Sequence, residues 1–444
     1  MRFEFILFAA VVGAFPITPA FSQADEGATQ IVTGIPAIQM FEIAERSLAT
    51  GDIDAVAEIY KALAKDPDSD IRNEARFRHA KLLEAQNRHT EAALLLRAIL
   101  DEKPEAQPVR LELAKILALM GDESGARRAL RQAQTVGGLP PEIARAVDQY
   151  SAILRSMKPL GASVELSLAP STNINRATSS TTLDTIIAPF ELSDDARAQS
   201  GVGVKIGGTG YARLPVTDEL RMTARASGQA NFYRKGEFND MVASAQIGAE
   251  GMLGYGRIRP QIGRSYRWFG GNLYATTDTV SVGVGHPLDR TTQVEVEGGI
   301  GKANYRTNDL QDGNIYDLSL SVEHAFTATT GGGLSLTGQR QRAADPGYST
   351  VSGGVGLLGW QEWGKTTFYG SVNITRLEAD ERLFLYPEKR KEWLYRATLG
   401  ATLRQLSWRE FAPMVRISYE RNDSTISIYD YRRFAVELGL TRAF

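Results

Sequence analysis

Hydrophobic and polar residues alternate along the C-terminal two-thirds of the chain, from about residue 161 to residue 444. The last segment carries its apolar side chains on one face, at Phe434, Val436, Leu438 and Leu440. Its charged residues, Arg433 and Glu437, fall on the other face. A period of two is typical of a β-strand with one apolar and one polar side. In a soluble sandwich the charged side faces water, whereas in a membrane barrel it lines the interior and the apolar side faces lipid.

Fourteen segments of this kind follow one another, separated by connections that alternate between long and short. They begin near Ser163, Gly201, Glu219, Met241, Gly256, Thr277, Thr292, Ile315, Gly333, Thr350, Thr367, Trp393, Phe411 and Arg432. Long connections include residues 177–199 and 378–392, and short ones include 215–218 and 254–255. An even strand number with long loops on one side and short turns on the other is typical of a bacterial outer-membrane barrel. The region is therefore predicted to be a 14-stranded antiparallel transmembrane β-barrel over residues 161–444.

Two sets of side chains follow from this prediction. Aromatic residues near segment ends are expected to form two interfacial girdles: Phe232, Tyr233, Tyr266, Trp268, Phe269, Trp360, Trp363, Trp393, Tyr395 and Trp408. The alternation assigns charged residues to the barrel interior, and the lumen-facing candidates are Arg259, Arg396, Arg404, Arg416, Arg433 and Glu437. Charges inside a barrel commonly pair with one another, so such residues either bind a passing molecule or only neutralise their neighbours.

The N-terminus resembles a secretory signal peptide over residues 1–24. Arg2 precedes an apolar run from Phe5 to Phe15, and Ser22-Gln23-Ala24 is similar to a small-residue cleavage site. A membrane anchor is the alternative, but the run is shorter than the roughly 20 residues that a spanning helix needs. A linker over residues 25–35 is expected to follow.

Residues 36–157 differ in kind, because their apolar residues recur at helical spacing. One unit carries Ala55, Ile59, Ala62 and Pro67, and the same offsets recur 37 residues later at Ala92, Leu96, Ile99 and Pro104. Ala126, Leu130 and Ala133 follow after a further 34 residues, and a helix over 142–157 is expected to cap the array. These are the spacings of tetratricopeptide repeats, which form an α-solenoid that binds polypeptides. The alternative is a helical bundle that only supports the second domain. Arg127, Arg128 and Arg131 are expected to lie on a solvated face, and binding of an acidic partner is the minor alternative.

The amino-acid composition excludes several kinds of partner and of catalytic or metal-binding site. The chain has 444 residues, a formal net charge of -2 and no cysteine, so nucleic acid is not expected as a partner and no thiolate can act as nucleophile or ligand. His79 and His89 are isolated, so neither a metal nor another cofactor is expected. Only His286 and His324 lie in the barrel half, and no nucleophile or acid can be assigned to either one. The chain is therefore not expected to be an enzyme.

The whole arrangement resembles the surface lipoprotein assembly modulator (Slam) family. The resemblance lies in the signal peptide, the repeat array, the fourteen-strand barrel that ends in Phe444, and the segment LSLAPSTNINRAT at residues 166–178. It implies an outer-membrane translocator, with its repeat domain in the periplasm, that delivers surface lipoproteins or secreted haem- or iron-binding proteins to the cell surface of a Gram-negative bacterium. Phe444, together with the apolar face of the last segment, resembles the signal that the barrel-assembly machinery recognises. Outer-membrane lipid and a client protein are the other expected partners of a monomer, and a passive porin with a periplasmic interaction domain is the alternative.

Overall fold

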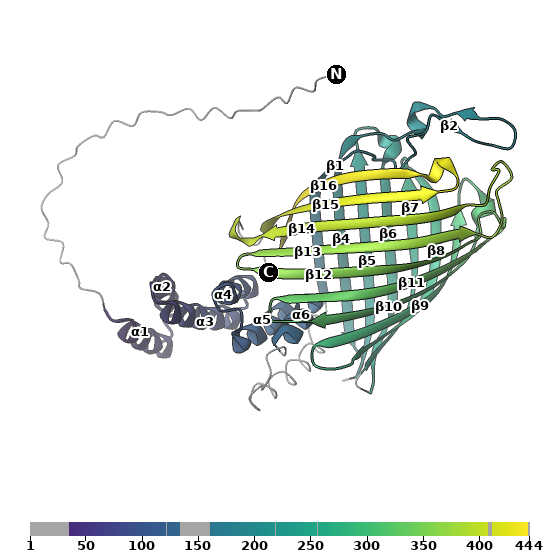
Figure 1. Ribbon diagram of the computed structural model, residues 1–444. Coiled ribbons are helices and arrows are strands. Elements are labelled where there is room, and N and C mark those ends of the chain that lie inside the picture. The colour runs from purple at the N-terminus through teal and green to yellow at the C-terminus, as the bar shows by residue number, and fades with distance from the viewer. Residues whose placement is uncertain are drawn as a thin grey trace, which may run out of the picture.

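The computed structural model describes residues 35–120, 122–133, 160–217, 219–254, 256–406 and 411–442, and it contains a helical array and a closed β-barrel (Figure 1). The expected signal peptide, most of the linker, the capping helix, Trp408 and Phe444 lie outside the described residues. The two-part fold class predicted from the sequence, a tetratricopeptide-like array followed by a barrel, is confirmed.

The helical array consists of three helix pairs within residues 35–133. Their bounds are α1 (Ala37–Ala49), α2 (Ile53–Leu63), α3 (Ser69–Ala85), α4 (His89–Glu102), α5 (Gln107–Leu119) and α6 (Glu123–Ala133). Asp52 caps α2, because its side chain accepts a hydrogen bond from the Ala55 N–H at 3.1 Å. No helix in the described part of the chain is both long and apolar enough to span a membrane.

The predicted repeat positions fall on the second helix of each pair. In the last two units they are buried, at Ala92, Leu96, Ile99, Ala126, Leu130 and Ala133. The first unit differs, because Ala62 is exposed and the buried face of α2 is formed by Val56, Tyr60 and Leu63. The repeat phase is therefore shifted by one residue in α2, where Tyr60 packs between the rings of Phe41 and His79.

The barrel comprises fourteen antiparallel strands. Their bounds are β1 (Leu160–Ser171), β4 (Gly201–Pro215), β5 (Leu220–Tyr233), β6 (Asp240–Leu253), β7 (Gly256–Phe269), β8 (Asn272–Pro287), β9 (Thr292–Tyr305), β10 (Gly313–Ala325), β11 (Thr330–Ala343), β12 (Thr350–Trp363), β13 (Thr366–Ala379), β14 (Lys391–Leu403), β15 (Phe411–Ser424) and β16 (Tyr431–Arg442). A separate two-stranded sheet pairs β2 (Thr182–Leu183) with β3 (Phe190–Glu191). The predicted starts agree closely, and the largest difference is at β8, which begins at Asn272 instead of Thr277.

The two ends of the barrel differ. One end, the turn end, carries mostly short connections such as Gly364-Lys365 and lies beside α5 and α6 (Figure 1). The other, the loop end, carries the long connection 172–200, which contains β2 and β3. Gly270-Gly271 is the exception at the loop end: it joins β7 to β8 in two residues, both with positive φ, at 58° and 82°. The array and the long loops therefore lie at opposite ends.

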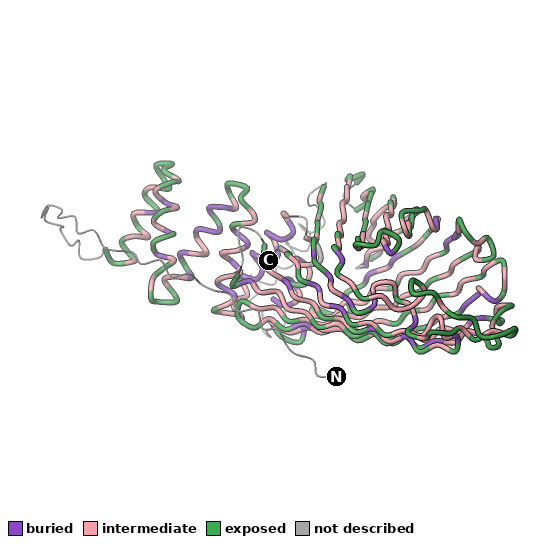
Figure 2. The backbone as a smooth tube through the Cα atoms, turned by 90° about the horizontal axis from the view of Figure 1, so that it is seen from above, coloured by how far each residue is buried: buried purple, intermediate pink, exposed green. Residues whose placement is uncertain are grey.

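Along the barrel strands the residues are mostly exposed or intermediate in burial, while the buried positions concentrate in the helices (Figure 2). On β16 the apolar face points outward, with Leu438 50% exposed, whereas Glu437 points inward and is 8% exposed. The aromatic girdle prediction needs correction at Tyr233, Phe269 and Trp360, which belong to the inward sets of their strands. Trp360 belongs to the inward set of β12 and is 8% exposed, whereas Trp363 on the same strand points outward and is 77% exposed. Successive residues of a strand point to opposite faces, so the odd or even position of an aromatic residue decides whether it faces lipid, and its closeness to the strand end does not.

Candidate functional site

The barrel closes where β1 meets β16, and we call this junction the seam. Its four ladder pairs are Leu166–Leu440, Ser167–Gly439, Leu168–Leu438 and Ser171–Ala435. On its other edge, β1 pairs with β4 over its whole length. No pair with β16 forms at Ala169 or Pro170, and Pro170 cannot donate a ladder hydrogen bond because it has no backbone N–H. Backbone pairing is therefore sparser at the seam than at the other junctions of the described barrel.

Polar side chains that follow β1 replace part of the missing ladder. The Thr172 N–H donates to the Phe434 carbonyl at 2.9 Å, and the Phe434 N–H donates to Thr172 Oγ1 at 2.9 Å. Asn173, which is 1% exposed, donates from Nδ2 to the Arg432 carbonyl at 3.1 Å. Its Oδ1 accepts from the Ala177 N–H at 3.1 Å, so the side chain fixes its own loop as well as the seam. These residues belong to the 166–178 segment that carries the family resemblance.

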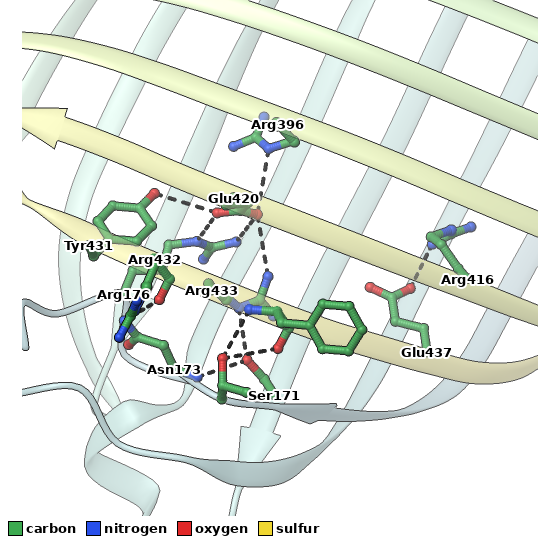
Figure 3. Close-up of polar contacts among 12 residues, drawn as sticks. Ser171, Asn173, Arg176, Arg396, Arg416, Glu420, Tyr431, Arg432, Arg433 and Glu437 are labelled. Carbon is green, nitrogen blue, oxygen red and sulfur yellow. Dashed lines mark hydrogen bonds and ion pairs between the residues drawn. The ribbon is translucent and has the colours of Figure 1, made fainter.

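A carboxylate cluster crosses the seam near the loop end, centred on Glu420 of β15 (Figure 3). Arg176 donates to Glu420 from Nε at 3.0 Å and from Nη2 at 3.3 Å, and Arg433 donates at 3.3 Å. Arg396 lies 3.5 Å away, and the Tyr431 hydroxyl donates at 3.4 Å. The Glu420 side chain is only 5% exposed, so its charge is balanced inside the barrel wall by several cations. The Arg176 contact links the loop after β1 with strand β15, and it therefore spans the seam.

A second carboxylate cluster lies closer to the turn end and is centred on Glu437 of β16. Arg416 donates to Glu437 at 2.7 Å, and Lys205 of β4 donates at 3.2 Å from the far side of β1. Arg416 also reaches Glu165 of β1 at 3.4 Å, and its Nε donates to the Tyr369 hydroxyl at 3.0 Å. We call the two clusters and the 172–173 contacts the seam clasp, because they join β1 and β4 to β15 and β16 through side chains.

The sequence-predicted lumen residues divide between this clasp and other places. Arg396, Arg416, Arg433 and Glu437 come together in the clasp. Arg259 also points inward, but it pairs with Glu295 on the opposite side of the barrel. Arg404 does not lie on a strand: it follows β14 in a short 3-10 turn and is buried against the helical array, which corrects its assignment to the lumen.

Sequence reasoning did not select Glu420, Arg176, Asn173 or Lys205. The place of Glu420 on the polar face of its strand was visible, but nothing in the pattern marks which inward carboxylate meets a cation across the closure. Phe434, Val436, Leu438 and Leu440 lie together on the outward face of β16, next to the seam.

The helical array contacts the turn end of the barrel through buried ion pairs. Glu362, at the end of β12, accepts from Arg97 of α4 at 3.1 and 3.3 Å. Arg110 of α5, which is 1% exposed, lies 3.7 Å from the same carboxylate. Arg404 donates to Asp101 of α4 at 2.8 Å. We call this set the docking cluster.

Burial shifts the pKa values of charged groups in the docking cluster. It raises the pKa of Asp101, a shift that the nearby Arg404 opposes, and it lowers the pKa of both Arg110 and Arg404. Two charged groups that are removed from water together must stay paired, so the cluster favours one fixed position of the array on the barrel.

The helix α6 also contacts the barrel, which corrects the expectation of a solvated arginine face. Arg131 donates to Gln293 at 2.9 Å and to Glu323 at 2.5 Å, and the Arg128 guanidinium lies 5.2 Å from the ring centre of Trp360. Beside these contacts, a cavity of about 340 Å³ is lined by α6 on one side and by the inner wall of the barrel on the other. The last described helix of the array, α6, therefore lies beside the lumen.

His324, one of the two histidines in the barrel half, lies on the outside of the barrel. His324 Nδ1 is 2.8 Å from Thr292 Oγ1, which in turn contacts Asp289 at 2.8 Å. Asp289 also accepts from the Thr291 and Thr292 N–H groups, so it orders the turn before β9 and does not orient the histidine. Among the described residues no group of three His, Asp or Glu side chains is placed to hold a metal ion.

Comparison with known proteins identifies this architecture. Residues 162–444, from β1 to the end of the chain, match the family model described as surface lipoprotein assembly modifier. The chain belongs to the surface lipoprotein assembly modifier family. Residues 83–149 match a tetratricopeptide repeat model. No curated protein matches the chain.

Solved outer-membrane proteins share the barrel only in outline. OmpT of Vibrio cholerae is 8% identical, with 64% of this chain and 98% of that chain covered and a TM-score of 0.37. The Pseudomonas putida toluene transporter TodX is 11% identical, with 70% and 94% covered and a TM-score of 0.37. The Salmonella typhi OmpF complex with daunomycin is 9% identical, with 63% and 96% covered and a TM-score of 0.35. Scores this low support no inference about this family member.

Family membership and the closed barrel place this surface lipoprotein assembly modifier in the outer membrane. The turn end and its helical array face the periplasm, and the loop end faces the cell exterior. Its role lies in surface lipoprotein assembly, with lipoproteins as the class of protein that it interacts with.

Proposed function

We propose that this protein is an outer-membrane translocator that delivers client proteins from the periplasm to the cell surface. The clients are surface lipoproteins or secreted haem- or iron-binding proteins. The observation that carries the proposal is the seam, where four ladder pairs and a set of side-chain contacts close the barrel. A wall that is closed mainly by side chains can part there while every other ladder stays intact.

The helical array supplies the capture step. Tetratricopeptide repeats bind polypeptide segments along a concave surface. The docking cluster holds this surface at the periplasmic end of the barrel, and α6 borders the cavity that leads to the inner wall. A client bound by the array is thus released next to the lumen, from which it passes outward through the lumen or along the opened seam.

The remaining parts of the proposal concern chemistry and partners. Export draws on the binding and folding energy of the client, with no cofactor and no catalytic step. The barrel-assembly machinery inserts the chain into outer-membrane lipid, and the protein works as a monomer.

The test is a comparison of surface proteomes. Intact cells with and without this protein are treated with a protease that cannot enter the periplasm, and the cleaved proteins are identified by mass spectrometry. We expect one or a few proteins to leave the surface of the deletion strain and to accumulate in its periplasm. Normal surface display of every protein in the deletion strain would overturn the proposal.

A passive porin is the second candidate, and two cavities along the inner wall, of about 340 and 740 Å³, favour it. Both are lined by charged side chains, including Arg225, Glu250 and Lys205. Conductance of the purified barrel in a planar bilayer separates the two functions. A stable open conductance that is unchanged by removal of residues 25–156, together with a normal surface proteome, would favour the porin.

A further inference from the structure

On the outer wall of the barrel a pair of charges lies below the loop-end rim, where lipid is expected. Arg264 of β7 and Asp278 of β8 face each other in register and point outward, five and six residues from the loop ends of their strands. The Arg264 guanidinium donates to both carboxylate oxygens, at 2.5 and 2.7 Å. The two side chains remain 53% and 48% exposed. Charge on the lipid face destabilises a barrel at depth, so such a pair calls for a polar partner.

The pair belongs to a longer row that crosses five strands in register. Asp278 stands opposite Lys302 of β9, Lys302 opposite Asn314 of β10, and Asn314 opposite Arg342 of β11. We call Arg264, Asp278, Lys302, Asn314 and Arg342 the basic row. With three cations and one anion, its net charge is 3 − 1 = +2. Lys302 and Arg342 are exposed, so both present their charge on the outer surface of the barrel.

An apolar groove of about 650 Å³ lies directly on the turn-end side of the basic row. Three of its aliphatic side chains, Ile262, Val280 and Ile300, stand two residues deeper into the membrane than the row on the same strand, and the fourth, Ile247 of β6, stands opposite Ile262. All four are more than half exposed, and Ala245 leaves room between them. The wall therefore presents a cationic strip at the outer edge of the membrane and an open apolar channel beneath it.

We propose that this part of the wall binds a lipid with a phosphate-bearing headgroup from the outer leaflet. The phosphate lies on Lys302 and Arg342, and one acyl chain fills the groove. Lys and Arg are the side chains that recognise phosphate, and an anionic headgroup neutralises the excess charge of the row. An acyl chain without phosphate would leave that charge unbalanced. This site is independent of client export and stands whether or not the protein is a translocator.

The experiment uses the purified full chain in detergent and measures lipid binding by native mass spectrometry. The probes are phosphatidic acid, diacylglycerol with the same acyl chains, and inorganic phosphate. We expect tight binding of phosphatidic acid alone. The double variant Lys302→Gln with Arg342→Gln should bind it roughly 30-fold more weakly, since each basic residue near a membrane surface contributes about 1 kcal/mol, or roughly fivefold.

Two further variants keep the test specific. Arg376→Gln with Lys391→Gln removes two outward cations from β13 and β14, away from the groove, and should change binding less than about twofold. Ala245→Phe fills the groove without changing charge and should weaken phosphatidic acid binding. Heat-dependent gel migration checks that each variant is a folded barrel.

Three results would overturn the proposal. Equal weakening by both double variants would reduce the site to general surface charge. Binding of diacylglycerol as tight as that of phosphatidic acid would remove the role of the phosphate. Displacement of phosphatidic acid by inorganic phosphate, with no effect of Ala245→Phe, would indicate an anion site that holds no lipid.

Discussion

The seam and the wall formed by β12 and β13 are closed in opposite ways. The β12–β13 ladder runs without interruption from Thr350–Ala379 to Trp363–Thr366, fourteen pairs in all, and a two-residue turn joins the strands. The seam has four pairs and is completed by Asn173, Glu420 and Glu437. The helical array docks on the end of the continuous wall, at Glu362.

If clients leave through the seam, as we propose, this difference lets one barrel hold the array and still open its wall. Backbone ladders are cooperative, because a strand cannot leave its neighbour without exposing a whole row of unsatisfied groups to lipid. Side-chain ion pairs can be exchanged one at a time for contacts with water or with another polypeptide. A rigid platform at β12–β13 thus keeps the array in place while the seam changes.

A covalent lock on the seam should have the largest effect. Leu168→Cys with Leu438→Cys introduces a disulfide across a registered pair, in a chain that has no other cysteine. If clients leave through the seam, surface display of the client found by the proteome comparison should fall to the level of the deletion strain. A reductant should restore it.

The matched lock joins the opposite wall. Leu357→Cys with Val372→Cys bridges an outward apolar pair of β12 and β13, and display should stay near the wild-type level. Normal display with a fully formed seam disulfide would show that the lumen, and not the seam, is the route.

The second largest effect is expected from removal of the Glu420 carboxylate, which should weaken the seam. Glu420→Gln keeps the shape of the side chain but leaves Arg176 and Arg433 without their anion, in a place where the carboxylate is only 5% exposed. Loss of one partner of a buried ion pair costs about 3 kcal/mol. We expect the barrel to unfold at lower urea concentration, as followed by heat-dependent gel migration.

The control is an exposed pair at the loop end. Asp380→Asn breaks the ion pair between Asp380 and Arg340, whose side chains are 37% and 32% exposed, respectively. It should lower the stability of the barrel by less than about 1 kcal/mol. Equal effects of the two substitutions would mean that the clasp does not hold the seam.

A substitution in the docking cluster should affect the β12–β13 wall, where the helical array is held. Glu362→Gln leaves Arg97 and Arg110 without their carboxylate, and this should weaken docking by about 2 kcal/mol or more. Hydrogen–deuterium exchange should rise in α4, in α5 and in the β12–β13 turn, while exchange at the seam stays unchanged. Glu91→Gln, which removes the exposed partner of Arg88, is the control and should change none of these segments. A rise at the seam as well would show that the two walls are coupled.

Much of this comparison was predictable from the sequence, because a period of two places neighbours such as Glu437 and Leu438 on opposite faces of a strand. It also located the strand starts, since turn residues break the alternation. The contact between Arg176 and Glu420 joins residues 244 positions apart and exists only because the sheet closes on itself. Alternation along one strand says nothing about which strand comes to lie beside it.

Two of the errors have a common physical cause. Arg128 and Arg131 lie on the polar face of α6, and a polar face looks the same in sequence whether it meets water or another charged surface. Arg404 continues the alternation of β14 by one residue, yet the strand has ended and the side chain packs on α4. Both errors concern the contact between the array and the barrel, which neither domain's own periodicity reveals.

The smallest expected effect lies within the array, away from both walls. Glu102 accepts hydrogen bonds from Arg72 and from Arg76, and these hold its pKa at about 2, below the usual value of 4.5. A carboxyl whose pKa is lower in the folded state stabilises the fold above its unfolded pKa and loses this contribution as the pH falls toward the folded value. The helical signal of the full chain at 222 nm should therefore melt a few degrees lower at pH 3 than at pH 6. In Glu102→Gln this difference should shrink, because the amide does not titrate. An undiminished pH dependence in Glu102→Gln would assign the acid sensitivity to other carboxylates.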